Sequence, residues 1–212
     1  MNVYDFDLTI YPTDCAIDFC LWCMKSHPKM WFTYFPRILK IVLFRGTRLI
    51  PEYMFQKKFL GFLTHIKNLD QQIEMYWDKN EKRIMPWYLE QKKPDDLIIS
   101  ASPSCLIAPI AKRLGVNYVA TEFDPEYGVF LGNLMYGMEK AEYVFDNNLA
   151  DKIDNFYSDS LSDTPIALCA KKAYLVKYNA SVLVDWPEMD SETKEKVKDK
   201  IDTGWNIHIK ED

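Results

Sequence analysis

Short apolar runs, separated by longer amphipathic stretches, predict the strands of this chain. Residues 2–6 (NVYDF) end in acidic residues, and residues 96–101 (DLIISA) form a second run of the same kind. Residues 116–121 (VNYVAT) form a third run, and Phe156–Ser158 and Tyr174–Lys177 are shorter candidates. Apolar runs of this length, bounded by turn-forming residues, are typical of buried strands. We therefore expect five strands, with chemically active side chains near their carboxyl ends.

Helical patterns alternate with these runs. After the second run, Ser102 and Pro103 suit a helix N-cap and a first-turn proline, and the helix is expected to end at Gly115. The alternation predicts an α/β fold, a doubly wound parallel sheet with helices on both faces. Residues 126–137 (EYGVFLGNLMYG) alternate in polarity and contain glycines, which predicts a small β-hairpin. The charged tail, residues 191–204, is predicted to be a solvated helix.

A large insertion follows the first strand. Asp7 and Ser100 lie 93 positions apart, whereas a crossover between parallel strands needs only about a dozen residues. We therefore predict an α-helical cap at residues 12–90, placed over the carboxyl ends of the strands, and a catalytic core formed by residues 1–11 and 91–212. Helical apolar spacing supports the cap within three ranges: residues 14–25, 53–66 and 69–91.

The composition argues against three classes of protein: disordered chains, nucleic-acid-binding proteins and membrane-spanning proteins. Of the 212 residues, 48% are hydrophobic and 15% are aromatic, which argues against a disordered chain. The formal net charge of -5 argues against a general attraction to nucleic acid, so no nucleic-acid partner is expected. No stretch reaches the roughly 18 uncharged apolar residues that a membrane-spanning helix needs.

The cysteines indicate a reducing location. They form an odd set without zinc-like pairing, which predicts free thiols in a cytoplasmic protein. Cys20-x-x-Cys23 also has the spacing of a redox pair, but it lies in the apolar run FCLWCM with no strand before it, which favours buried thiols. The full set is Cys15, Cys20, Cys23, Cys105 and Cys169.

Two acidic motifs follow predicted strands. Asp5 and Asp7, in D-x-D-x-T, can leave the chain on the same side, where two carboxylates can bind a hard cation and divide nucleophilic and proton-transfer roles. Asp159 and Asp163, in YSDSLSD, can face one site if the chain turns into a helix. Asp159 would then complete an oxygen cage for Mg²⁺ with Asp5 and the backbone carbonyl of Asp7. Each motif alone is equally typical of solvated loop aspartates or of a helix cap.

A serine and a lysine provide groups that bind anions. The hydroxyl of Ser100, with the backbone N–H groups of Ala101 and Ser102, suits a phosphate oxygen. Lys140 follows the hairpin and begins a helix, from which its ammonium can neutralise phosphate charge. Taken singly, such a serine more often caps a helix and such a lysine is more often solvated.

In this order, the motifs resemble those of the haloacid dehalogenase (HAD) superfamily of phosphatases. D-x-D-x-T follows the first strand, LIISASPS contains the second, GMEK surrounds Lys140, and YSDSLSD follows a later strand. They are most similar to the phosphoserine-phosphatase-like branch, subfamily IB. The resemblance covers residues 1–11 and 95–177, and it implies an HAD-like Rossmannoid core with a C1 helical cap and a β-hairpin flap.

The resemblance also implies roles for the matched residues. Asp5 would attack phosphorus and become an aspartyl phosphate, while Asp7 would protonate the leaving oxygen and then deprotonate water. Ser100 and Lys140 would hold the transferring phosphoryl oxygens. Transport ATPases of the superfamily have threonine in place of Asp7 and dehalogenases lack this aspartate, so Asp7 implies hydrolysis of phosphate esters. The carboxylates implied around Mg²⁺ are Asp5, Asp7, Asp159 and Asp163.

Three functions remain open on the sequence. Phosphoserine phosphatases have paired glycines where this chain has Ala101 and Ser102, so the first expectation is another small phosphorylated metabolite. The second is a membrane-surface lipid phosphatase. Lys25–Pro51 has six basic residues among aromatic ones and no acidic residue, which suits an anionic membrane surface. This segment also resembles the cap of phosphatidylglycerophosphate phosphatases. A bundle helix with snorkelling basic residues explains this segment equally well, without a peripheral contact to an anionic membrane. A non-catalytic module that binds phosphorylated ligands is the third.

Overall fold

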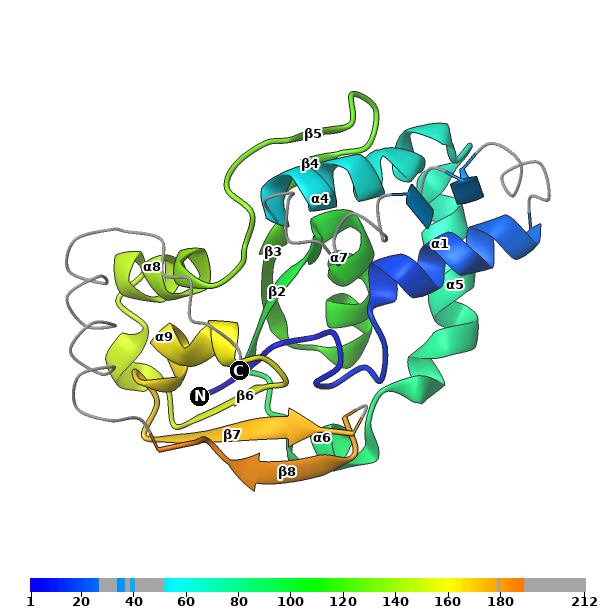
Figure 1. Ribbon diagram of the computed structural model, residues 1–212. Helices are drawn as coiled ribbons and strands as arrows, with labels where there is room; N and C mark the ends of the chain where they lie inside the picture. Colours follow the sequence, from blue (N-terminus) through cyan, green and yellow to red (C-terminus); the bar gives the residue numbers. More distant parts are fainter. Residues whose placement is uncertain (27–33, 37–38, 41–51, 179, 189–212) are drawn as a thin grey trace.

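A six-stranded sheet forms the centre of the molecule (Figure 1). The computed structural model describes residues 1–26, 34–36, 39–40, 52–178 and 180–188. Within them the strands lie side by side in the order β3-β2-β1-β6-β7-β8. Their bounds are Asn2–Tyr4 (β1), Leu97–Pro103 (β2), Asn117–Thr121 (β3), Asn155–Ser158 (β6), Lys172–Lys177 (β7) and Val182–Asp185 (β8).

Five of these strands are parallel. Val3 of β1 lies opposite Leu97 of β2 on one side and Phe156 of β6 on the other, while β8 pairs antiparallel with β7. Because parallel strands end at the same edge of a sheet, the carboxyl ends of β1, β2 and β6 meet there. The predicted parallel sheet is confirmed. The edge strand β8 was not predicted; its apolar run, VLV, is only three residues long and most of the strand is exposed.

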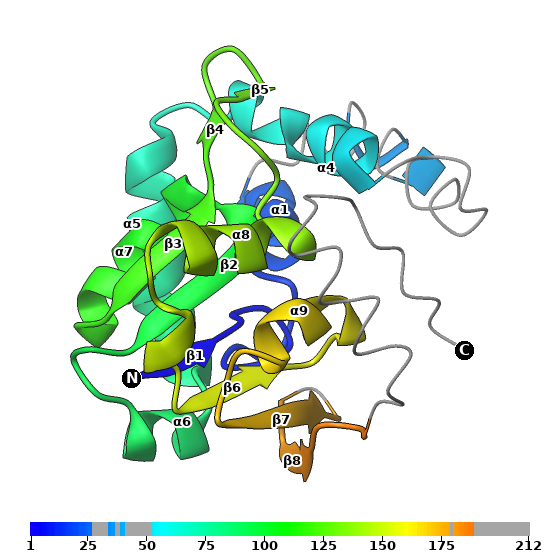
Figure 2. The same cartoon turned by 90° about the vertical axis from the view of Figure 1, so that its left-hand side faces the viewer.

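Helices cover both faces of the sheet, as Figure 2 shows. Ile98 of β2 belongs to an apolar cluster that includes Ile107 of α7, whereas its neighbour Ile99 belongs to a second cluster that includes Val144 of α8 and Ile166 of α9. Successive residues of a strand point to opposite faces, so α7 covers one face and α8 and α9 cover the other. The bounds of these helices are Ser104–Leu114 (α7), Met138–Asp146 (α8) and Thr164–Ala167 (α9).

Helices α1, α4 and α5, which are inserted between β1 and β2, lie beyond the carboxyl ends of these strands, whereas α6 lies near β7 and β8 (Figure 1). Helix α5 packs against α7, and the indole Nε1 of Trp77 donates to the carbonyl of Leu106 at 2.9 Å. We refer to α1, α4 and α5 as the inserted helices; the division at residues 12–90 stays a prediction. Their bounds, with the short elements after them, are Cys15–Ser26 (α1), Glu52–Leu60 (α4), Gly61–His65 (η1), Leu69–Asn80 (α5), Glu81–Arg83 (η2) and Pro86–Gln91 (α6).

Three local expectations were wrong in detail. Ser102 does not cap α7: strand β2 continues through an irregularity to Pro103, which precedes the helix without a side-chain cap. The helical pattern over residues 69–91 breaks into α5, η2 and α6, since Pro86 begins a new helix. The hairpin starts earlier than predicted, with β4 (Phe123–Asp124) paired to β5 (Val129–Phe130). The predicted tail helix lies outside the described residues.

Candidate active site

The chain leaves β1 through a tight turn that carries the first two aspartates. Asp5 still belongs to the backbone ladder, because its N–H donates to the carbonyl of Tyr157 in β6 at 2.8 Å. The carbonyl of Phe6 then accepts from the N–H groups of Ile10 and Tyr11, each at 3.0 Å. This turn follows the strand directly, and it holds the motif D-x-D-x-T at the carboxyl edge of the sheet.

Lys140 connects the nucleophile candidate to the last acidic motif. Its Nζ, from the first turn of α8, donates to Asp5 Oδ1 at 2.9 Å and to Asp163 Oδ2 at 2.8 Å. All three residues are buried. Burial disfavours the ammonium, but the charges of Asp163 and Asp5 outweigh it and raise the pKa of Lys140. Burial raises the pKa of Asp5 as well, and Lys140 opposes that rise.

Asp7 is held by two donors from other elements. The hydroxyl of Ser102 in β2 donates to Oδ2, and the N–H of Cys15 at the start of α1 donates to Oδ1 at 2.6 Å. Burial, followed by the charge of Asp14, raises the pKa of Asp7 to about 7. A carboxyl group with such a pKa can both give and take a proton near neutral pH.

The serine-rich end of β2 lies beside this carboxylate. Ser100 is fully buried, and its hydroxyl accepts from the N–H of Ser102 at 3.1 Å. Ala101 is half-buried, and its carbonyl accepts from the hydroxyl of Thr121 at 2.8 Å. Ser100 is therefore joined to Asp7 through Ser102. Its assignment to phosphate, with Ala101 and Ser102, stays a prediction.

Negative charge accumulates where β6 ends. Burial, and then the charges of Asp5 and Asp163, raise the pKa of Asp159 to about 8. Ser158 Oγ donates to Asp163 Oδ2 at 2.8 Å, whereas the buried Asp163 Oδ1 accepts no hydrogen bond from the described residues. In that part of the chain, no three His, Cys, Asp or Glu side chains stand ready as a complete metal cage. Three neighbouring carboxylates with one ammonium between them are nevertheless an environment that favours a cation.

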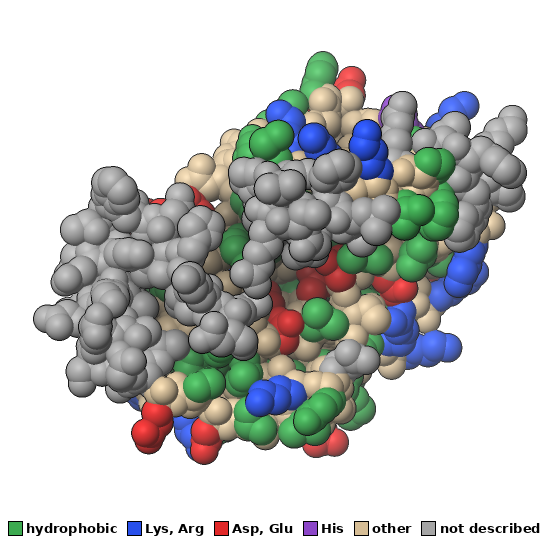
Figure 3. Space-filling model, viewed as in Figure 1, with side chains coloured by type: hydrophobic (Ala, Val, Ile, Leu, Met, Phe, Trp, Pro, Cys, Tyr) green, Lys and Arg blue, Asp and Glu red, His purple; other side chains and the backbone are tan. Residues whose placement is uncertain are grey.

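Acidic side chains also gather on the surface between the sheet and the inserted helices, as Figure 3 shows. The buried carboxylates described above lie at the carboxyl edge of the sheet, where open α/β sheets bind their ligands. The fold therefore brings the carboxylates of the two acidic motifs together, and their catalytic and metal-binding roles stay predictions.

Comparison with known proteins identifies the family. A family model described as haloacid dehalogenase-like hydrolase matches residues 3–168, most of the chain. The protein belongs to this family. No curated protein is significantly similar in sequence.

Solved structures share the fold of this haloacid dehalogenase-like hydrolase at low sequence identity. A protein of unknown function from Bordetella pertussis Tohama I has a TM-score of 0.67 and 18% identity, over 97% of this chain and 96% of that one. A phosphoserine phosphatase, solved as an analogue of its phospho-aspartyl intermediate, has a TM-score of 0.53 and 16% identity, over 81% and 83%. Cytosolic 5'-nucleotidase IIIB bound to cytidine has a TM-score of 0.54 and 14% identity, over 96% and 77%.

Sequence reasoning missed several groups that hold this hydrolase site together. The hydroxyl of Thr9 accepts from the N–H of Asp159 at 3.0 Å, and Ser158 donates to Asp163. Both are hydroxyl residues within or next to the recognised motifs, which was a signal that could have been used. The N–H of Cys15 could not have been found, because a backbone group has no sequence signature.

Two further sequence features of this haloacid dehalogenase-like hydrolase are the Cys20-x-x-Cys23 pair and the basic segment Lys25–Pro51. Cys20 and Cys23 are free and buried, and burial raises the pKa of each thiol to about 12, which argues against a redox role. Most of the basic segment Lys25–Pro51 lies outside the described residues. Among the described residues, no helix is long and apolar enough to cross a membrane.

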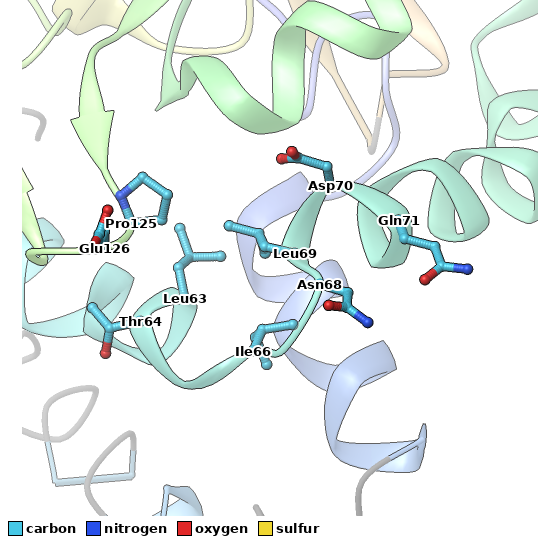
Figure 4. A pocket seen from close by; sticks show the side chains of 9 residues that line it. All are labelled: Leu63, Thr64, Ile66, Asn68, Leu69, Asp70, Gln71, Pro125 and Glu126. Atoms are coloured by element: carbon cyan, nitrogen blue, oxygen red, sulfur yellow. The ribbon is translucent and has the colours of Figure 1, made fainter.

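An open groove of about 520 Å³ lies between η1, the start of α5 and the hairpin (Figure 4). Its walls combine apolar, amide and acidic side chains, and they include no basic residue. Walls of this kind do not favour a phosphate group. The lining residues are Leu63, Thr64, Ile66, Asn68, Leu69, Asp70, Gln71, Pro125 and Glu126.

Proposed function

We propose that this hydrolase is a phosphomonoesterase that hydrolyses a small phosphorylated metabolite through an aspartyl phosphate on Asp5. One observation carries the proposal: Asp5 forms a buried contact with Lys140, and the neighbouring carboxyl group of Asp7 has a pKa of about 7. Stepwise ester hydrolysis needs two groups: a nucleophile, whose ionised form Lys140 favours here, and an acid-base group with a pKa near neutrality.

In the first step, an Oδ atom of Asp5 forms a bond to phosphorus and the bond from phosphorus to the ester oxygen breaks. Asp7 donates its proton to that oxygen, so the alcohol leaves uncharged. Lys140 favours the ionised form of Asp5 while the negatively charged phosphoryl group approaches, and Asp163 holds this lysine in position. Burial of this lysine strengthens its electrostatic effect, because the surrounding dielectric is low.

In the second step, water attacks the aspartyl phosphate. Asp7, now ionised, takes a proton from this water, the bond from phosphorus to Asp5 Oδ breaks, and inorganic phosphate leaves. The two donors on Asp7, Ser102 and the N–H of Cys15, keep its carboxylate in one orientation for both proton transfers. Asp5 is then ionised and Asp7 protonated again, as they were before the first step.

We assign Mg²⁺ to the same site. Asp5 and Asp159 would bind it with the backbone carbonyl of Asp7, and the unpaired Oδ1 of Asp163 suits a hydrogen bond from a water of its hydration shell. Both side-chain oxygens of Asp7 already accept hydrogen bonds from protein donors, so the metal role predicted for this side chain becomes indirect, whereas Asp163 would act through its unpaired Oδ1. The cation would neutralise charge on the transferring phosphoryl group.

A lipid phosphate at a membrane surface is the second candidate substrate. What favours it is helix α4, whose exposed side chains include the aromatic Tyr53, the apolar Met54 and the basic Lys57 and Lys58. Aromatic and basic residues on one helix face suit an anionic bilayer surface. Sedimentation with anionic liposomes at low salt separates the candidates, since an absence of binding would count against the lipid substrate.

The decisive experiment is hydrolysis of an aryl phosphate by Asp5→Asn, with Asp151→Asn, an exposed acid on the short helix η3 (Ala150–Lys152), as control. We expect Asp5→Asn to lower kcat by about a thousandfold or more and the control to retain wild-type activity. Rapid acid quench with a radiolabelled ester should show label on the wild-type protein but not on Asp5→Asn. Unchanged turnover by Asp5→Asn would refute the covalent mechanism, and full turnover in EDTA would refute the metal assignment.

A further inference from the structure

The two chain segments that connect the inserted helices to the sheet run side by side. The first follows the D-x-D-x-T turn, and the second leads from η2 into α6. They are joined directly, because the N–H of Met85 donates to the carbonyl of Ile10 at 2.9 Å. Any movement of the inserted helices relative to the sheet must therefore pass through this pair of segments.

A polar network fastens both segments at one carboxylate oxygen, Asp18 Oδ2 of α1. Arg83 Nη1 of η2 forms an ion pair with this oxygen. The hydroxyls of Tyr11 and Tyr76 donate to it at 2.7 and 3.0 Å, and they lie 2.9 Å from each other. Arg83 also donates to Tyr11 OH at 2.8 Å and, through Nη2, to Thr13 Oγ1 at 3.2 Å.

This network is anchored in the turn that carries Asp7. Tyr11 is fully buried, its N–H donates to the carbonyl of Phe6 at 3.0 Å, and it forms an isolated β-bridge with Asp7. On the other side, the N–H of Cys15, three residues before Asp18 on α1, donates to Asp7 Oδ1. Asp7 is thus held by a turn and a helix that Arg83 bonds to each other.

We propose that Arg83 is a positioning residue, which holds Asp7 in its reactive orientation by linking Tyr11, Thr13 and Asp18 across the connection between sheet and inserted helices. The inference rests on the proposed acid-base role of Asp7. A planar guanidinium can bind several oxygens in fixed directions at once, which a lysine ammonium does less well. Displacing a reacting group by about 1 Å can lower a rate by about a hundredfold.

A second arginine provides a matched control. Arg113 of α7 also ties the sheet side of the molecule to the inserted helices, through ion pairs with Glu74, Asp78 and Glu81. It resembles Arg83 in forming several bonds across the same boundary, but none of its recorded bonds reaches the D-x-D-x-T turn. Arg113→Met therefore removes a comparable tether, which reaches η2 at Glu81 but leaves the bonds of Arg83 to Tyr11, Thr13 and Asp18 in place.

The experiment compares Arg83→Met and Arg113→Met by steady-state kinetics and by amide hydrogen exchange. For Arg83→Met we expect kcat to fall by between about tenfold and a hundredfold with KM within about twofold, because Asp7 acts in the chemical steps. Exchange should accelerate at the amides of Ile10, Tyr11 and Cys15. The kcat and the exchange rates of Arg83→Lys should lie between those of the wild type and those of Arg83→Met. Arg113→Met should keep the wild-type kcat and the slow exchange of this turn.

Each result decides the inference. Equal losses of kcat in Arg83→Met and Arg113→Met, a change in KM alone, or unchanged exchange at Tyr11 would overturn it. If Arg83→Met does not fold, Arg83→Lys and Tyr11→Phe, which removes only a hydroxyl, carry the same comparison. If the wild-type protein hydrolyses no phosphate ester, the proposed function fails, while faster exchange in Arg83→Met alone still shows that Arg83 supports this turn.

Discussion

Ser102 Oγ donates a hydrogen bond to Asp7 Oδ2, although the two residues lie 95 positions apart in the sequence. The contact exists because β2 lies next to β1 and continues past Ser100, which brings the serine level with the turn after β1. The same serine was expected to cap a helix or bind phosphate. It does not cap α7, its binding of phosphate stays a prediction, and its position gives it a direct influence on the proton affinity of the proposed acid-base group.

Ser102→Ala should move the pH dependence of the reaction. Asp7 must be protonated to release the alcohol, so kcat/KM is expected to fall as the pH rises through the pKa of Asp7, about 7. The hydroxyl of Ser102 stabilises the ionised carboxylate and lowers this pKa. Its removal should therefore shift the alkaline limb to higher pH. Ser104→Ala is the control, since Ser104 bonds to the surface residue Glu122; an identical shift in both variants would contradict this role.

The stability of the metal-free protein should fall as the pH rises from about 4 to about 8. Folding raises the pKa of Asp7 to about 7 and of Asp159 to about 8, whereas in an unfolded chain an aspartate titrates near 4. Between these values the folded protein binds more protons than the unfolded chain, so raising the pH favours unfolding. Thermal unfolding in EDTA measures this slope.

The same thermal unfolding experiments test the binding of Mg²⁺ and the contribution of Asp159 to it. Mg²⁺ should raise Tm more at pH 8 than at pH 5, because it binds the ionised carboxylates. Asp159→Asn should flatten the slope in EDTA and weaken the response to Mg²⁺, whereas the exposed control Asp151→Asn should leave both unchanged. A slope of opposite sign, or a response to Mg²⁺ that Asp159→Asn leaves intact, would be inconsistent with this charge arrangement.

Lys140→Met should abolish activity and also destabilise the fold. It removes the ammonium that Asp5 and Asp163 share in the interior, and a buried charge left without its partner costs about 3–5 kcal/mol. Urea unfolding measures the loss. Lys171→Met provides the comparison, because Lys171 also pairs with an aspartate, Asp154 at 2.7 Å, but at the surface. Little loss of stability in Lys140→Met would show that the buried charges are compensated in another way.

The sequence by itself determined the fold class. Apolar runs such as LIIS and the helical spacing between them predicted the parallel sheet and most of its strands, because burial of a strand on both faces requires a continuous apolar run. The spacing of D-x-D-x-T, Lys140 and YSDSLSD also indicated the family. These signals are local, so they can be read without knowing which elements are neighbours.

Only the tertiary structure decided how the polar groups act. The sequence could not show that Ser102 and the N–H of Cys15 hold Asp7, that Lys140 lies between Asp5 and Asp163, or that Arg83 reaches Tyr11. The physical reason is that proton affinity and orientation depend on burial and on partners within a few ångströms, and in this molecule many of those partners come from distant parts of the chain.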